Sequence, residues 1–372
     1  MKIVFSTDQI YLHGGLEKVM AEKANYFVTV FGFEVVILTT QQENKPPCYT
    51  LHENIKLIDI GINYNRNLSY FHIKNVLKIP DHFSKMKSVL DAINPDVIII
   101  CNYAFDFYWA PFINAKALKF KEYHSSRYDE STARIKNKSF LRKLVYNAND
   151  FIESKYDKLI LLNPDEKVFF KSTNLVVIPN SISIQQHLKA GLNSKNVIAA
   201  GRIALVKGFE NLIKAWALVA KQEPESQLHI YGQGEKKYVE ELQLLIDENK
   251  LENTIFIKEA TNNLLQIMTD YSLYVLSSHS ECFPMVLLES LSIGLPIVSF
   301  DCPTGPKNIL SNNQDGILVA NGDHYELANK IVYLLQNKDI RIQMGKFAIQ
   351  KSKQFATQNV MKNWFELFQN CK

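Results

Sequence analysis

The sequence contains few cysteines, and they form no pattern. Five are scattered along the 372 residues, at Cys48, Cys101, Cys282, Cys302 and Cys371. They include no C-x-x-C pair and no cysteine–histidine spacing typical of a metal site, which argues against a structural zinc site or a disulfide framework. Since scattered cysteines in odd number fit a reducing compartment, we expect a cytoplasmic protein.

Long apolar segments are absent as well. The most hydrophobic stretch, Val97 to Ile113, is interrupted by Asn102 and Asp106. No run reaches the roughly 18 apolar residues that a membrane-spanning helix needs. The first residues form a short strand-like run followed by polar side chains, which is unlike a signal peptide. We therefore expect no integral membrane segment.

Charge of one sign is not in large excess. The net charge of +4 is too small for a typical nucleic-acid-binding protein, so we expect no nucleic acid partner. Hydrophobic residues make up 47% and charged residues 22%, which is an ordinary globular balance. With 372 residues the chain exceeds one average domain, and its length predicts two.

Apolar strand-like runs alternate with amphipathic helical stretches along the whole chain. Continuous β-branched runs of this kind suit a parallel sheet covered on both faces. In the first half the predicted strands are Lys2–Thr7, Val35–Thr40, Asp96–Cys101, Lys158–Asn163 and Leu175–Pro179, with a helix at Leu16–Val28. In the second half they are Asn196–Ala200, Gln227–Tyr231, Thr254–Ile257, Leu273–Ser277, Pro296–Phe300 and Gly316–Val319, with helices at Phe209–Lys221, Met285–Ile293 and Tyr325–Gln336.

This alternation predicts an α/β fold with two doubly wound, Rossmann-like domains in tandem. A polar stretch after Asn180 is interpreted as a linker, so the domains are placed at residues 1–180 and 195–356. The last helical stretch, residues 357–372, carries Trp364, Phe365 and Phe368 and is expected to pack back on the first domain. Ligands of such sheets bind beyond the carboxyl ends of the strands, so two facing domains would form a cleft between them.

The segment 278–306 (SHSECFPMVLLESLSIGLPIVSFDCPTGP) is the most informative part of the sequence. Glu281 falls in the loop after a strand, and Glu289 falls about one turn into the following helix, so both carboxylates can face a ligand at the sheet edge. The start of that helix offers unpaired N–H groups for an anion. Carboxylates repel phosphate but accept hydrogen bonds from hydroxyl groups, so the two glutamates suit ribose and sugar hydroxyls. A solvated loop glutamate plus one that complements the helix dipole is the plainer alternative.

Two cations follow the first strand of the second half, in Gly201–Gly208 (GRIALVKG). Arg202 and Lys207 precede a helix, where cations are mildly unfavourable, so an anionic partner such as a diphosphate accounts for them better than chance does. A second loop, YGQGE, carries Gly232 and Gly234, which permit close approach of a ligand to the backbone or form a plain turn.

Taken together, these ordered motifs resemble glycosyltransferase family 4. The likeness rests on G-R-x(4)-K-G, the glycine turn, and E-x(7)-E within ECFPMVLLE followed by GLPIVSFD, and it spans the second half. The resemblance implies the GT-B architecture of two facing Rossmann-like domains with an interdomain cleft. It makes the first domain the acceptor side and the second the nucleotide-sugar-binding side.

The resemblance also implies a role for each motif residue. Arg202 and Lys207 would bind the donor diphosphate, Glu289 the ribose hydroxyls, and Glu281 the hydroxyls of the transferred sugar. The backbone after Glu281 would cap the sugar and phosphates, through Phe283, Pro284, Met285, Val286 and Leu287. Ile257 and Lys258 fall where the family contacts the base, and Gly232 where the backbone approaches the donor.

The first half adds two candidates. Gly14 and Gly15 lie between a strand and a helix; in the family this loop approaches the distal phosphate and the sugar, although a tight turn explains them equally well. His124 follows a weak strand pattern and matches the histidine that the family places beside the donor sugar. A lone histidine is more often structural. The acidic residues that commonly follow it are missing, and Ser181 stands where a glycine is usual.

Two stretches of the first half are both basic and apolar, namely Arg66–Lys87 and Arg134–Lys143. Amphipathic basic segments can dock on anionic membranes, and they can equally be ordinary solvated helix faces. Docking would make the protein peripheral on the inner face of the cytoplasmic membrane.

The resemblance implies a retaining transferase that moves a hexose or N-acetylhexosamine from a UDP-sugar to a glycan or lipid-linked acceptor in surface polysaccharide synthesis. The sequence contains no D-x-D motif, so we expect neither a metal nor another cofactor, with Arg202, Lys207 and a helix end stabilising the leaving diphosphate. Glu281 and His124 complete the expected catalytic set. The alternatives are a nucleotide-sugar epimerase or hydrolase of the same fold, and a non-catalytic sugar-nucleotide-binding subunit.

Overall fold

The computed structural model describes residues 1–102, 104–114, 116–136 and 139–371. The chain forms two compact units. The first comprises Met1–Ile178 together with Trp364–Lys372, and the second comprises Pro179–Asn363. Each unit has its own parallel sheet and its own core, and each is described by itself.

The sheet of the first unit has seven parallel strands in the order β3-β2-β1-β4-β5-β6-β7. The order reverses between β1 and β4, which makes the sheet doubly wound and marks the edge where ligands of such folds bind. The strands are β1 (Lys2–Thr7), β2 (Glu34–Thr39), β3 (Lys56–Asp59), β4 (Val97–Ile100), β5 (Leu118–Glu122), β6 (Lys158–Leu161) and β7 (Leu175–Val177).

The sequence pattern missed one strand of this sheet and gave only a weak signal for another. Edge strand β3 (KLID) is short, and its residues are exposed or half-buried, so it lacks a continuous apolar run. In β5 (LKFKE), Lys119, Lys121 and Glu122 are buried although they are charged. Their burial is possible because each finds hydrogen-bond or ion-pair partners inside the unit.

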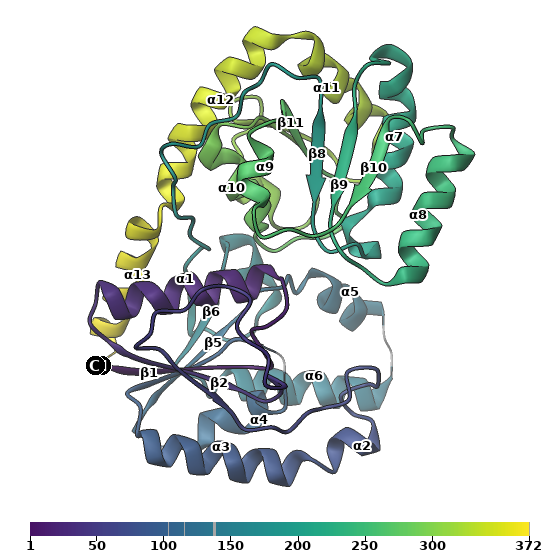
Figure 1. Cartoon of the computed structure of the whole chain (residues 1–372). Helices are drawn as coiled ribbons and strands as arrows, with labels where there is room; N and C mark the ends of the chain where they lie inside the picture. The colour runs from purple at the N-terminus through teal and green to yellow at the C-terminus, as the bar shows by residue number, and fades with distance from the viewer. Residues whose placement is uncertain (103, 115, 137–138, 372) are drawn as a thin grey trace. The chain divides into compact units, whose positions relative to one another are not determined.

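Helices cover both faces of the first sheet (Figure 1). Figure 1 shows α1 on one side of the sheet and α3 and α4 on the other. The helices of this unit are α1 (Gly15–Thr29), α2 (Ile73–Val76), α3 (Ile79–Ile93), α4 (Asp106–Trp109), α5 (Tyr128–Lys136) and α6 (Phe140–Glu153), with 3-10 turns η1 (Ala110–Phe112) and η2 (Pro164–Phe169).

The end of the last helix, α13 (Thr357–Asn370), contributes aromatic side chains to the first unit. Trp364 and Phe368 are buried, and both rings contact Phe27 of α1, with ring centroids 6.1 and 5.5 Å away. Phe120 of β5 stacks on Phe368 at 6.1 Å. Buried aromatic rings of this size contribute a large share of core stability.

The sheet of the second unit has six parallel strands in the order β10-β9-β8-β11-β12-β13. It is also doubly wound, and its order reverses between β8 and β11. All six strands were predicted from the sequence to within two residues. They are β8 (Val197–Ala200), β9 (Leu228–Tyr231), β10 (Ile255–Lys258), β11 (Leu273–Leu276), β12 (Ile297–Asp301) and β13 (Gly316–Ala320).

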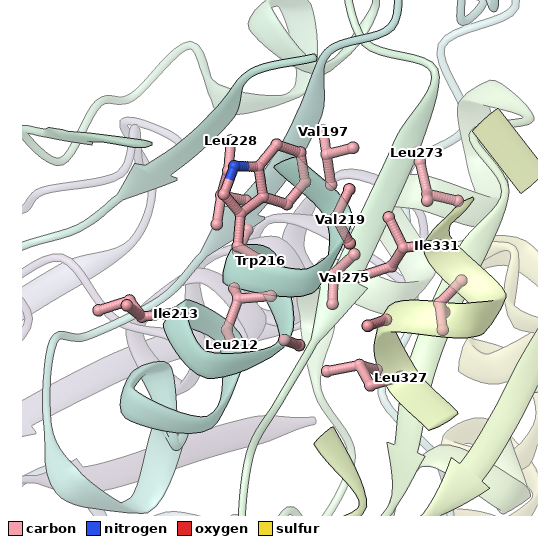
Figure 2. Close-up of a cluster of buried hydrophobic side chains, with 14 of the residues drawn as sticks. Val197, Leu212, Ile213, Trp216, Val219, Leu228, Leu273, Val275, Leu327 and Ile331 are labelled. Atoms are coloured by element: carbon pink, nitrogen blue, oxygen red, sulfur yellow. The ribbon is translucent and has the colours of Figure 1, made fainter. Parts of the chain in front are cut away.

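The core of this unit lies between the sheet and helices α7 and α11 (Figure 2). Trp216 of α7 is completely buried, and Figure 2 shows its ring among side chains of the strands, including Val197 and Leu228. The helices of the unit are α7 (Phe209–Gln222), α8 (Lys236–Glu248), α9 (Leu264–Met268), α10 (Met285–Ile293), α11 (His324–Gln336) and α12 (Lys338–Ser352), with 3-10 turns η3 (Leu205–Lys207), η4 (Pro306–Asn308) and η5 (Lys353–Phe355).

Candidate functional site

The point where strand order reverses in the second sheet carries two of the predicted motifs. Strands β8 and β11 are neighbours and run parallel, so their carboxyl ends meet at one edge. The loop after β8 holds Arg202 and Lys207, and the loop after β11 holds Glu281. Ligands of doubly wound sheets bind at this kind of edge.

Hydrogen bonds to backbone carbonyl groups connect the two loops. The N–H of His279 donates to the carbonyl of Val206 (2.8 Å), and Ser277 Oγ donates to the carbonyl of Lys207 (3.0 Å). Gly208 follows with a φ of 59°, and a Cβ there would lie 2.2 Å from the carbonyl oxygen of Ser277. Glycine is needed at this position both for the backbone conformation and for the space.

Lys207 and Glu281 meet directly. Lys207 Nζ lies 2.6 Å from Glu281 Oε1, and Ser278 Oγ donates to the same oxygen at 2.7 Å. The Glu281 N–H donates to the carbonyl of Pro303 (2.8 Å), so its backbone is held as well. The sequence pattern assigned these side chains to different parts of the donor, and in the structure they form an ion pair with each other.

Arg202 is placed differently from Lys207. Its side chain is exposed, and within the described residues it makes no ion pair or hydrogen bond through its guanidinium. It therefore adds a net positive charge to an edge where Lys207 is balanced by Glu281.

The segment from Phe283 to Leu287 leads into and begins α10. Pro284 precedes the first helical residue, Met285, at which the sequence pattern also began the helix. Asn180 Nδ2 donates to the carbonyl of Phe283 (3.2 Å) and so helps to fix the start of the helix. Phe283, Pro284, Met285 and Leu287 are buried and Val286 is half-buried, so any contact with a ligand here would be made mainly by the backbone.

Glu289 lies on α10 and is almost fully buried. Burial and, after it, the charges of Glu281 and Glu289 raise the pKa of the Tyr274 hydroxyl, so both carboxylates lie within electrostatic range of this group. Tyr274 is itself held by a hydrogen bond from its hydroxyl to the carbonyl of Ala200 (2.9 Å). The structure thus brings the two predicted glutamates to one region beside the end of β8.

The glycine turn after β9 is explained by packing. A Cβ on Gly232 would lie 2.0 Å from the carbonyl oxygen of Gly201, and one on Gly234 would lie 2.0 Å from that of Ile203. The Gly232 N–H donates to the carbonyl of Lys258 (3.0 Å). Ile257 and Lys258 end β10, two strands away from β8, with Ile257 half-buried and Lys258 exposed.

The first unit places its two predicted motifs after β1 and β5. Gly14 precedes the first residue of α1, Gly15, with an extended backbone, and a Cβ on Gly14 would meet the Glu17 carboxylate at 2.2 Å. His124 follows β5, and its side chain is 13% exposed. Its Nε2 lies 3.4 Å from Glu122 Oε2.

A cluster of potential metal ligands surrounds this histidine. Cys101, Glu122 and His124 offer ligand atoms within 4.8 Å of one another. However, the Lys23 ammonium contacts the Glu122 carboxylate directly, and burial raises the pKa of the Cys101 thiol well above its usual range. A divalent cation would have to sit beside a buried ammonium and displace a strongly held proton. The donor set therefore fits an ion-pair cluster better than a metal site.

The sequence analysis missed several residues that shape these two regions. Ser278 begins the quoted segment and Ser277 ends the strand before it, but neither serine carries a sequence signal for a hydrogen bond between the loops. Lys23 and Glu122 could not be identified from the sequence because a charged residue within a helix or strand pattern predicts an exposed side chain.

Within the described residues, no helix combines the length and apolar character needed to cross a membrane.

Residues 181–351 match the family model described as glycosyl transferases group 1. The chain is 29% identical over 214 residues to an uncharacterized glycosyltransferase of Haemophilus influenzae, covering 56% of this chain and 60% of that protein. It is 26% identical over 250 residues to the poly(ribitol-phosphate) alpha-N-acetylglucosaminyltransferase of Staphylococcus aureus, covering 66% of this chain and 49% of that protein. The matches thus span about half the length of these relatives.

Among solved structures, the Anabaena Alr3699/HepE protein in complex with UDP-glucose superposes with a TM-score of 0.79. It covers 100% of both chains at 18% sequence identity, and this likeness shows the fold. The matched segment 181–351 contains the Lys207–Glu281 pair and all of α10. The chain therefore has the GT-B fold, and its segment 181–351 is similar to the group 1 glycosyltransferases.

Proposed function

We propose that the chain is a retaining glycosyltransferase that moves a hexose or N-acetylhexosamine from a UDP-sugar to a glycan or lipid-linked acceptor. One observation carries the proposal. Lys207 and Glu281 meet at the reversal point of the second sheet, inside the segment that matches the glycosyltransferase family. At this edge of the sheet, a cation that can bind a diphosphate lies beside a carboxylate that can accept hydrogen bonds from sugar hydroxyls.

The choice of a UDP-sugar is supported by the relatives. The structural neighbour was solved with UDP-glucose, and the Staphylococcus aureus relative is named for transfer of alpha-N-acetylglucosamine. The name of that relative also supports retention, because the common UDP-hexoses carry an α linkage. Its named acceptor, a poly(ribitol-phosphate), supports a role in building surface polymers such as capsule, O-antigen or exopolysaccharide.

The chemistry follows from how charge changes during transfer. As the sugar departs with oxocarbenium character, negative charge grows on the leaving diphosphate, and positioned cations stabilise it. Arg202 is exposed and unpaired among the described residues, and Lys207 can exchange Glu281 for a phosphate oxygen. The N–H groups at the start of α10 would add partial positive charge. We propose that these groups hold the diphosphate without a metal, in keeping with the absence of a D-x-D motif.

Glu281 has to change partner when a donor binds. A carboxylate beside a diphosphate is repelled, whereas hydroxyl groups donate hydrogen bonds to it. The proposed exchange therefore sends Lys207 to the diphosphate and frees one Glu281 oxygen for a hydroxyl of the transferred sugar. Ser278 would keep the carboxylate in place during the exchange, since it donates to the same oxygen.

The test is incubation with a panel of UDP-, GDP- and dTDP-linked sugars while release of the nucleotide is measured. Transferases without an acceptor commonly hydrolyse their donor slowly. We expect release of UDP from one UDP-hexose or UDP-N-acetylhexosamine, accelerated by a suitable acceptor, with retention of the anomeric configuration. No release from any sugar nucleotide would count against the proposal, and release that no acceptor accelerates would favour the hydrolase or epimerase alternative.

We further propose a cytoplasmic location with peripheral docking on an anionic membrane, and the structure distinguishes the two candidate segments. In Arg66–Lys87 most cations are already engaged. Arg66 lies 3.6 Å from Asp8, Lys78 donates to the carbonyl of Ile62, and Lys85 and Lys87 pair with acidic neighbours on α3. This segment has little charge left for lipid headgroups.

The first turns of α6 offer a better surface. Phe140 and Leu141 are 73% and 72% exposed, and Leu144 and Val145 are about half exposed on the same stripe. Arg142 and Lys143, between them, form no ion pair with any described residue. Exposed apolar side chains beside unpaired cations suit an anionic bilayer surface. Arg134 is paired with Glu130 and Asp150, and Lys138 lies outside the described residues.

A further inference from the structure

The first unit contains a buried ion pair beside His124. Lys23 of α1 and Glu122 of β5 are each only 2% exposed, and the Lys23 ammonium contacts Glu122 Oε1. Removing two charges from water costs several kcal/mol per ion, so buried pairs of this kind add little to stability on balance. The position of the pair suggests a different use.

The second oxygen of the same carboxylate faces His124. Glu122 Oε2 lies 3.4 Å from His124 Nε2 and 3.8 Å from Cys101 Sγ. His124 Nε2 is buried and meets the geometric requirements of a hydrogen bond with no described atom. The Glu122 carboxylate therefore lies within ion-pair distance of a buried ring nitrogen that has no other hydrogen-bond partner among the described residues.

The carboxylate is held from several sides. Glu122 is paired in the sheet with Ile160 of β6, which fixes its backbone. Lys23 Nζ lies 4.3 Å from the centroid of the Trp364 ring, so a cation–π contact holds the ammonium. Burial alone would raise the pKa of Glu122, but the charge of Lys23 is the first of several causes that outweigh it and lower that pKa, so the carboxylate stays ionised.

We infer that Glu122, held in place by Lys23, is a positioning residue for His124. Its carboxylate accepts a hydrogen bond from the Nε2–H of the ring and leaves Nδ1 as the nitrogen that faces a substrate. The inference rests on the proposed function and on the expectation from the sequence that His124 contacts the donor sugar. Carboxylates that orient a functional histidine through its other ring nitrogen are a recurrent arrangement in proteins.

The simpler account is that the pair only ties α1 to β5. The two accounts predict different results when both charges are replaced. Lys23→Met with Glu122→Met removes the ion pair while keeping similar volume, an exchange that is often neutral or stabilising for a buried pair. Lys119→Met is the matched control, because Lys119 is also buried on β5 but donates to the carbonyl of Asn114, away from His124.

The first measurement is the tautomer of His124 in the wild-type protein, from long-range ¹H–¹⁵N NMR spectra at neutral pH. We expect the proton on Nε2 in the wild type and in Lys119→Met, and a mixture of tautomers in the double methionine variant. A wild-type ring with its proton on Nδ1 would overturn the inference. This readout needs no turnover, so it decides the inference even if the protein transfers no sugar.

The second measurement is a double-mutant cycle on donor turnover, using His124→Ala and the double methionine variant. We expect the methionine substitutions to lower kcat about tenfold in the wild type, with an unchanged melting temperature, and to have no further effect once His124 is alanine. An equal loss in both backgrounds would show that the pair acts independently of His124 and would overturn the inference. Absence of wild-type turnover, by contrast, would contradict the proposed function.

Discussion

Lys207 Nζ and Glu281 Oε1 lie 2.6 Å apart, although 74 residues separate them in the chain. They come from the loops that follow β8 and β11, the two neighbouring strands at which the second sheet reverses its order. The pair is half-buried, with 22% and 10% of the two side chains exposed, so solvent screens it only in part. The cation proposed to bind diphosphate is thus balanced by the carboxylate proposed to bind sugar.

Glu281→Gln separates the two proposed roles. The substitution removes the charge that competes for Lys207, so we expect UDP to bind at least as tightly as to the wild type. We expect donor turnover to fall by about 100-fold, because the amide replaces the carboxylate that would orient the sugar. Calorimetric titration of UDP and a nucleotide-release assay measure the two effects. Weaker UDP binding in this variant would contradict the proposed exchange of partners.

Gly234→Ala tests whether the glycine turn after β9 serves packing. A Cβ at this position would lie 2.0 Å from the carbonyl oxygen of Ile203, so the β8 and β9 loops would have to separate. We expect a loss of roughly 1–3 kcal/mol in the free energy of unfolding, measured with urea. Gly191→Ala is the matched control, since its nearest atom would be an ordinary 3.4 Å away. Equal stability of the two variants would argue against the packing role.

The buried His82 is expected to make the free energy of unfolding of the first unit depend on pH. Burial lowers the pKa of His82 to about 4, and its Nδ1 lies 2.8 Å from the Tyr64 hydroxyl. Because the unfolded chain takes up this proton near pH 6.5 and the folded chain does not, stability falls as pH drops from 6.5 towards 4. This single group accounts for a loss of about 2 kcal/mol between pH 7 and pH 5.

The matching measurement is urea denaturation of the wild type and His82→Gln at both pH values. Glutamine does not titrate in this range, so we expect the variant to lose about 2 kcal/mol less than the wild type on acidification. Other titrating groups affect both proteins equally and cancel in the comparison. A parallel decline of the two proteins would show that His82 takes up its proton in the folded state.

The proposed membrane docking can be tested at the apolar stripe of α6. We expect Phe140→Ser with Leu141→Ser to weaken binding to anionic phosphatidylglycerol vesicles more than tenfold, because each apolar side chain contributes about 1.5–3 kcal/mol when buried. Phe71→Ser with Leu77→Ser is the control, since these side chains are equally exposed on the segment whose cations are engaged. Vesicle sedimentation at low and high salt measures the binding. A larger loss for the control than for the α6 variant, or no binding of the wild type, would contradict docking through α6.

Much of the fold follows from local sequence. The strands of the second sheet are continuous apolar runs bounded by glycine, proline or polar residues, so their position could be predicted from hydrophobicity alone. Strand β5 could not, because Lys119, Lys121 and Glu122 are buried only through partners contributed by distant segments. Charged residues in a local sequence pattern predict exposed side chains, whereas the burial of these side chains depends on tertiary contacts.

The same limit applies to the candidate site. The types and order of Arg202, Lys207, Glu281 and Glu289 were visible in the sequence, but the Lys207–Glu281 contact was not, since it depends on which strands are neighbours. The turn glycines show the converse. The sequence left open whether Gly232 and Gly234 admit a ligand or form a plain turn, and in the structure both lie in close contact with the loop after β8.

The most direct test of the proposed diphosphate site is the affinity for UDP of Lys207→Ala, with Lys214→Ala as the control for loss of an exposed lysine on α7. Calorimetric titration at 0.15 M salt, on protein shown to be folded by circular dichroism, gives both dissociation constants. We expect at least tenfold weaker binding for Lys207→Ala, corresponding to about 1.4 kcal/mol or more, and unchanged binding for the control. Equal affinity of Lys207→Ala and the wild type would contradict the assignment of this edge as the diphosphate site.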